Sequence, residues 1–190
     1  MLKENFKNKT LKILILIIAI VVVVLLIIVG LYNHLISMDN RCKNAWSQID
    51  NQLKRRADLI PNLVEVTKGY AKHESETLVN VINARNNAYS MSDIAKNSEE
   101  VSKNLKNLLM LGESYPELKA NELFKNLQIE LTGTEDKIAF ARQFYNDTVQ
   151  HFNTSITIFP NNIMASIMKL KEKEYFKVSD EEKENIKVNL

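Results

Sequence analysis

The apolar positions of the chain open with one uninterrupted run. Ile13–Leu31 contains nineteen residues without a polar side chain. As an α-helix this run would be about 28 Å long, close to the roughly 30 Å hydrocarbon thickness of a bilayer. The pattern therefore predicts a transmembrane helix over residues 13–32 that contacts the lipid bilayer. A cleaved signal peptide is disfavoured, because its apolar region is normally about 7 to 15 residues long and ends at a small-residue cleavage site, which is missing here.

After the span, apolar residues recur in alternating steps of three and four, which is the pattern of a helix packed along one face. No glycine or proline interrupts residues 32–60. The pattern predicts that the membrane helix continues beyond the bilayer. We call such a line of apolar residues along one face of a helix its seam. The seam here contains Leu35, Met38, Cys42, Ala45, Ile49 and Leu53.

Pro61 stands inside the next apolar run. Proline has no N–H and fits the first turn of a helix, while it pushes the residue before it, Ile60, towards extended geometry. We therefore predict that the first helix ends near Leu59 and that a second helix begins at Pro61. So short a connection predicts an antiparallel hairpin, in which Leu53 would face Val66 or Thr67.

The second half of the chain adds further helices to the prediction. Met91–Glu100 is polar and mixed, which predicts a loop, and the helix after it would stop near Gly112. A connection around Pro116 precedes an amphipathic helix that would stop before Pro160, and a short helix would follow it over residues 161–170. The seam of the amphipathic helix is very regular: Leu127, Leu131, Thr134, Ile138, Ala141, Tyr145, Thr148 and Phe152.

These elements predict an all-α fold, in which an N-terminal transmembrane helix continues into an antiparallel up-and-down bundle of about four long helices. Gly69 and Gly133 fall inside predicted helices, where glycine is unfavourable, so they predict close helix approach. Tyr175 and Phe176 are candidates for docking on the bundle. The expected regions are a basic flank over residues 1–12, the transmembrane helix over 13–32, the bundle over 33–170 and a charged tail over 171–190.

Charge is uneven along the chain. Residues 1–32 carry four lysines and one glutamate, which is a net charge of +3. Because the whole chain has a net charge of +2, the remaining residues have a net charge of −1. A folded part without a basic surplus does not predict binding to nucleic acid. By the positive-inside rule, the lysines before the span predict a cytoplasmic N-terminus and residues 33–190 outside a bacterial cell membrane.

Several separated motifs occur in one order over about Tyr32–Pro160. They are AWSQIDNQLKRRADLIPNLVEVTKGYAKHE (Ala45–Glu74), ESYPELKAN, FKNLQIELTGTEDKIAFARQFYND and FNTSITIFP. With them the chain resembles the LemA family, although its tail is short and charged where some relatives have a long tail of low complexity. The resemblance implies a membrane-anchored helical bundle, and it implies no established biochemical activity.

Residue patterns typical of catalysis are missing from the sequence. None of the three histidines follows a glutamate by three positions, which the Glu-x-x-His metal motif of helical bundles requires. His73-Glu74 begins an H-E-x-x-H pattern, but Thr77 stands where the second histidine is needed. The glycines are isolated, and no G-x-S-x-G nucleophile elbow occurs. We therefore expect no enzymatic activity, no cofactor and no metal.

Polar residues beside the seams are the candidates for a site. Gln128, Glu135 and Arg142 are seven residues apart and form one stripe along a helix. A buried charge is tolerated when it is paired and is costly when it is not. Either Glu135 and Arg142 bond across helices and fix their register, or the stripe lines a polar pocket. The candidate structural or binding residues are Gln52, Arg55, Arg56, Asp58, Asn62, Arg85, Gln128, Glu135 and Arg142.

Three functions stay open at this point. The favoured one is a non-enzymatic single-pass membrane protein whose bundle acts as an interaction or scaffold module at the cell envelope, by binding a protein partner or by self-association. The alternative is a ligand-sensing or signalling module that binds a small molecule or peptide in a polar cleft between helices. An enzyme with an unrecognised site is the least favoured.

Overall fold

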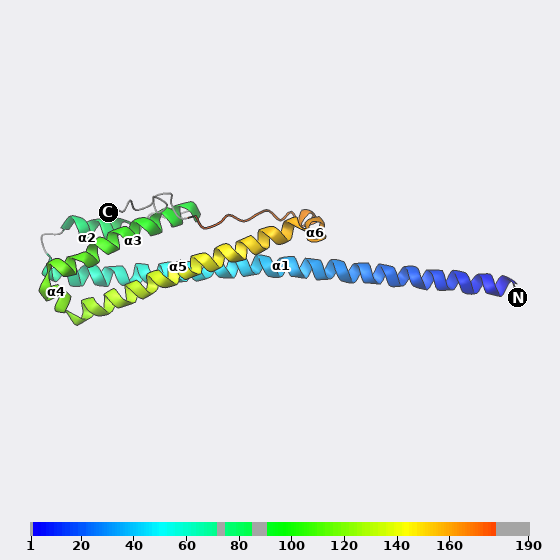
Figure 1. Cartoon of the computed structure of the whole chain (residues 1–190), viewed down its shortest axis with the longest axis horizontal. Helices are drawn as coiled ribbons and strands as arrows, with labels where there is room; N and C mark the ends of the chain where they lie inside the picture. The colour runs from blue at the N-terminus through cyan, green and yellow to red at the C-terminus, as the bar shows by residue number, and fades with distance from the viewer. Residues whose placement is uncertain (1, 72–74, 85–90, 178–190) are drawn as a thin grey trace, which may run out of the picture. The chain divides into compact units, whose positions relative to one another are not determined.

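The computed structural model describes residues 2–71, 75–84 and 91–177, and these residues are helical over almost their whole length (Figure 1). No strand occurs within those ranges. The prediction of an all-α fold is confirmed. The helices are α1 (Leu2–Tyr70), α2 (Ser75–Ala84), α3 (Met91–Ser114), α4 (Pro116–Ala120), α5 (Glu122–Thr157) and α6 (Asn161–Ile167).

The apolar run lies in the first part of α1. Among the described helices, α1 is the one that is long and apolar enough to cross a bilayer, and none of its most apolar stretch is buried by protein. Large apolar side chains from Leu11 to Val29 are roughly half exposed. Hydrocarbon suits such a surface far better than water does. The chain is a membrane protein with one candidate spanning helix near its N-terminus.

The predicted hairpin at Pro61 is wrong, because α1 continues through this residue to Tyr70. Pro61 is exposed, so its ring points away from the core and the helix loses one hydrogen bond, to the carbonyl of Ala57. Leu53 and Val66 therefore lie on one helix, roughly 20 Å apart by helical rise. The buried positions keep a single phase through the proline, and packing on both sides of it holds the helix together: Ile49, Arg56, Ile60, Leu63 and Thr67.

The predicted loop over Met91–Glu100 is also wrong, since these residues form the first turns of α3. The buried face of α3 extends back into this stretch, since Ser98 and Val101 are both buried and are three residues apart. α3 also passes through Gly112 to Ser114. At Gly112 a side-chain Cβ would lie 2.8 Å from Cε1 of Phe124, so this glycine allows a close ring contact and does not end the helix.

The predicted end of α5 and start of α6 are confirmed, while α6 ends at Ile167, three residues before the predicted end. The connection before α5 contains Tyr115 and Asn121 as its non-helical residues, and α5 ends at Thr157, before Pro160. Every predicted seam position of α5 is buried except Thr148, which is partly buried. Gly133 does not mark a close helix approach, and neither does Gly69, because a Cβ at either position would meet nothing within 4 Å.

The chain divides into two compact units. The bundle unit comprises Lys43–Asp147 with the residues from Glu174, and the anchor unit comprises the residues up to Cys42 with Thr148–Lys173. The core of the bundle unit draws on five helices. It contains Ile60, Leu63, Val64, Leu78, Val81, Val101, Leu105, Leu108, Leu118, Phe124, Leu127 and Leu131.

Helix directions in the bundle unit follow from its contacts. Along α1 the residues Trp46, Arg56 and Tyr70 contact Tyr145, Glu135 and Asn121 in turn, so α1 and α5 are antiparallel. α3 is antiparallel to α5 as well, since Ser102 bonds Glu135 and Gly112 lies against Phe124. α1 and α3 therefore run in the same direction. The intervening α2, which packs against α3, must run back, and the helices alternate up, down, up, down (Figure 1).

In the anchor unit, the end of α5 and the chain after α6 hold α1. The Cys42 thiol donates to the carbonyl of Thr148 across 3.7 Å, and Lys173 forms an ion pair with Asp39 at 2.7 Å. The side chain of Asn153 binds the main chain of Lys173 twice, through its N–H at 2.8 Å and its carbonyl at 2.9 Å. Cys42 is a free, buried cysteine, and burial raises the pKa of its thiol.

Candidate functional site

Arg56 is the most unusual residue of the bundle unit, because it is charged and only 3% exposed. It occupies a seam position of α1, where the heptad pattern turns its side chain towards the other helices. Its two terminal nitrogens donate four hydrogen bonds. They reach Ser98 Oγ at 2.8 Å, the Ser98 carbonyl at 3.2 Å, Ser102 Oγ at 2.9 Å and Glu135 Oε2 at 2.9 Å. A buried guanidinium needs partners of this kind to offset its lost hydration.

Glu135 supplies the opposite charge from α5. Its second oxygen, Oε1, accepts a 2.6 Å hydrogen bond from the hydroxyl of Ser102. Arg56, Ser102 and Glu135 thus form a closed triangle that joins α1, α3 and α5. The Glu135 side chain is 39% exposed, so solvent reaches one side of the pair and reduces the cost of burying it.

Arg142 reaches the same serine from the next heptad of α5. One of its nitrogens donates to Ser98 Oγ at 2.5 Å, and its guanidinium lies 4.7 Å from the ring centre of Phe176. Glu135 and Arg142 therefore both bond across helices, but through different partners. Ser98 accepts from two arginines, which brings two positive charges to one hydroxyl on α3.

Phe176 is the one of the two tail aromatics that docks, since it is buried while Tyr175 is exposed. Its ring also lies 6.1 Å from that of Trp46. The side chain of Asn146 accepts from the Phe176 N–H at 2.8 Å and donates to the Phe176 carbonyl at 3.0 Å. This bidentate contact involves only the main chain of Phe176, so it would form with any side chain at this position. The contacts of the ring with Arg142 and Trp46 depend on the side chain.

The remaining candidates are scattered. Arg55 is exposed and only 3.7 Å from Glu130, which is a surface ion pair. Gln52 is partly buried, and its Oε1 has no hydrogen-bond partner in the part of the chain that the structure describes. Asp58, Asn62 and Gln128 are exposed, and Arg85 lies outside the described residues. Sequence reasoning missed Ser98 and Ser102, because serines in a polar run carry no signal of burial.

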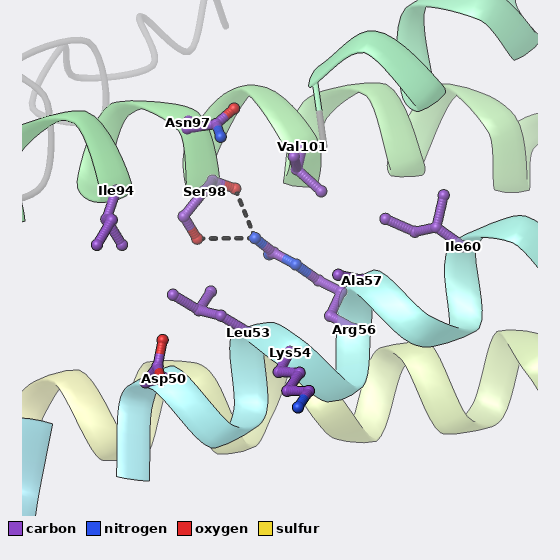
Figure 2. Close-up of a pocket in the computed structure, with 10 residues that line it drawn as sticks. All are labelled: Asp50, Leu53, Lys54, Arg56, Ala57, Ile60, Ile94, Asn97, Ser98 and Val101. Carbon is purple, nitrogen blue, oxygen red and sulfur yellow. Dashed lines mark hydrogen bonds between the residues drawn. The ribbon is translucent and has the colours of Figure 1, made fainter. Parts of the chain in front are cut away.

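Among the described residues of the bundle unit, hollows open at two places beside α1. One lies between α1 and α3 beside Arg56 and has a volume of about 330 Å³. Figure 2 shows Leu53 of α1 opposite Ile94 of α3. The other lies between α1 and α5 and has a volume of about 350 Å³. It is lined by Gln48, Asn51, Gln52, Asp136, Lys137, Phe140 and Ala141.

The polar cluster is suited to holding helices together. Both terminal nitrogens of Arg56 are engaged by protein groups, as the dashed lines to Ser98 in Figure 2 illustrate for one of them. Over the described ranges, no group of three or more His, Cys, Asp or Glu side chains could hold a metal ion. The geometry offers charge-assisted hydrogen bonds, which are among the strongest that side chains make.

Comparison with known proteins fits this architecture. The LemA family model matches residues 45–190, which include both hollows and the Arg56 cluster. The chain is 29% identical over 163 residues to Protein LemA of Metamycoplasma hominis, covering 83% of this chain and 74% of that one. It is also 24% identical over 174 residues to Magnetosome protein MamQ 2 of Paramagnetospirillum magneticum, covering 76% of this chain and 64% of the relative's length. Because the family model spans most of the chain, this protein belongs to the LemA family.

Proposed function

We propose that this protein is a non-enzymatic, single-pass membrane protein whose helical bundle acts as an interaction or scaffold module at the cell envelope. The observation that carries the proposal is the hollow between α1 and α5. An interaction module needs a surface on which binding of a partner is energetically favourable, and the residues around this hollow provide such a surface.

Phe140 is the main apolar group at the hollow, and it is 70% exposed. An aromatic side chain this exposed gains considerably when a partner covers it, and aromatic residues are enriched at the centres of protein interfaces. Ile129, equally exposed, lies eleven residues earlier on α5. Eleven residues are close to three full turns, so Ile129 and Phe140 share one face of the helix.

Gln52 adds a polar contact at the same place. Its Oε1 is buried without a hydrogen-bond partner among the described residues, and a buried acceptor in this state costs about 1 to 3 kcal/mol. A donor from a partner would remove that cost. An apolar anchor beside an unsatisfied polar group, with Asp136 and Lys137 close by, fits a protein surface as the occupant better than it fits lipid.

The test is site-specific photocrosslinking in intact membranes. A photoreactive phenylalanine analogue at Phe140 should yield a discrete crosslinked species, with this chain or with another envelope protein. The matched control carries the analogue at Lys119 of α4, which is exposed and outside the hollow. Equal or absent crosslinking at both positions would contradict the proposal.

A substitution separates binding from folding. Phe140→Asp should abolish the crosslink captured from a second position in the hollow, such as Asn51. It should leave the melting temperature nearly unchanged, because an exposed side chain contributes little to stability. Loss of the crosslink together with a large fall in melting temperature would show that Phe140 serves the fold instead.

The hollow beside Arg56 favours the alternative function, a sensing module for a small molecule or peptide. Its walls are mainly apolar, with Leu53, Ile60 and Val101, while Asp50 and Lys54 add charge (Figure 2). At about 330 Å³ it falls within the usual range for small-ligand sites. Filling it with Leu53→Trp should block ligand-induced stabilisation in a thermal-shift screen, whereas the crosslink at Phe140 should survive.

A further inference from the structure

The junction of α5 and α6 exposes a group of large apolar side chains. Phe159 is 78% exposed, and Ile158, Ile163 and Ile167 are each more than half exposed. The opposite side of α6 is covered, since Met164 and Ala165 are buried. Ile163 and Ile167 are four residues apart on α6, so they share one face of that helix, and Phe159 lies in the turn just before it. We call Ile158, Phe159, Ile163 and Ile167 the apolar tip.

The level of the tip relative to the membrane span follows from contacts inside the anchor unit. Cys42 on α1 contacts Thr148 on α5, and Asp39 is paired with Lys173, which follows α6. α5 runs nine residues beyond Thr148 to its end at Thr157. Nine residues span roughly 14 Å. In an antiparallel pair, the end of α5 therefore lies level with about Asn33 of α1.

Asn33 is two residues from the end of the apolar run at Leu31. Exposure along α1 changes at the same place: Leu35 is fully buried and Tyr32 is about half exposed. Protein thus stops covering α1 where the segment that crosses the bilayer ends. The apolar tip begins at this level, where the interfacial layer of the membrane would lie.

The chemistry of the tip suits that layer. Aromatic and aliphatic side chains partition into the boundary between head groups and acyl chains, while lysines beside them reach anionic head groups. Lys169 and Lys171 are exposed directly after α6. An aqueous surface with four large apolar side chains would instead be unfavourable unless something covered it.

We propose that the apolar tip is a second membrane contact, which inserts into the interfacial layer of the same bilayer that α1 crosses. The occupant of this surface is lipid. The anchor unit would then be held at two points, a spanning helix and an interfacial helix, and its tilt on the membrane would be restricted.

Spin labels on the full chain, reconstituted in vesicles of phosphatidylcholine and phosphatidylglycerol, test this. Single cysteines at Phe159, Ile163 and Ile167 are introduced with Cys42→Ala as background. Collisions with oxygen, which concentrates in lipid, should be severalfold more frequent at these positions than collisions with a water-soluble nickel chelate. The matched control is Leu123→Cys, an exposed apolar site near the start of α5, where the nickel chelate should dominate.

A label at Val22 separates the proposal from the membrane span itself. Val22 should show the oxygen signature of the bilayer interior. If Val22 reports lipid while Phe159 and Ile163 match the aqueous control, the second contact does not exist. If both probes are blocked at the tip, protein covers it, which would also overturn the proposal.

Discussion

Arg55 and Arg56 are neighbours in the sequence with opposite environments, and they make a matched pair of variants. Arg56→Ala should destabilise the bundle by about 3 kcal/mol, because it breaks a buried pair and removes the hydrogen bonds that Arg56 donates to Ser98, Ser102 and Glu135. Arg55→Ala should cost no more than about 1 kcal/mol, since both members of its ion pair are half exposed. Thermal unfolding of the full chain in detergent measures both. Equal losses would contradict the importance of the Arg56 cluster.

Two glycines give a second residue-scale prediction. Gly112→Ala should destabilise the chain by about 1 to 2 kcal/mol, because the new methyl would lie 2.8 Å from the ring of Phe124, which is itself fully buried and has little room to move. Gly133→Ala meets no atom within 4 Å and should stabilise α5 by up to about 1 kcal/mol. Gly133→Ala is the control, because both variants make the same change inside a helix and differ in whether the new methyl group meets another side chain. Stabilisation by both variants would show that the Phe124 ring can move to make room for the methyl group.

At the scale of residues, the sequence could identify Glu135 and Arg142 as charges beside a seam, because their spacing is visible. It could not identify their partners. Arg56 and Ser98 occupy seam positions that a search for apolar residues skips. Ser98 also interrupts the apolar pattern of α3, so the missed serine and the missed first turns of that helix have one cause.

At the scale of elements, regular apolar spacing decided what could be predicted. The seam of α5 repeats over several heptads, and its extent was predictable to within a few residues. Pro61 led to the wrong prediction of a hairpin because proline usually ends a helix. The buried positions of α1 continue beyond it. Tertiary packing of Ile60 and Leu63 outweighs one lost hydrogen bond.

Pro61→Ala tests the continuous α1. Alanine restores the hydrogen bond to Ala57 and removes the clash of the ring, so the variant should be more stable by about 1 to 3 kcal/mol. The melting temperature of the full chain should rise. Asn62→Ala, at an exposed position next to it, should change stability by less than about 0.5 kcal/mol and serves as the control. A loss of stability in Pro61→Ala would support a turn at this residue.

At the scale of the whole molecule, the orientation in the membrane is the prediction that the lysines before the span motivate. A membrane-impermeant thiol reagent applied to whole cells should label Lys119→Cys, an exposed position. Lys7→Cys should be labelled only after lysis. The native Cys42 gives little background, because it is buried and burial raises the pKa of its thiol, so near neutral pH the reactive thiolate is scarce. Labelling of Lys7→Cys alone in intact cells would reverse the orientation.

The stripe of Gln128, Glu135 and Arg142 has a consequence for how α1 and α5 find their alignment. Helices with heptad seams can slide by seven residues, about 10 Å, and still match apolar side chains with apolar side chains. In the native alignment Arg56 meets Glu135. A slide one way would bring Gln128 to Arg56 and remove its counter-charge, and a slide the other way would bring Arg142 and oppose two positive charges in a buried place. The stripe therefore specifies the register of α1 and α5, because it favours one alignment over two others that the apolar residues alone would allow.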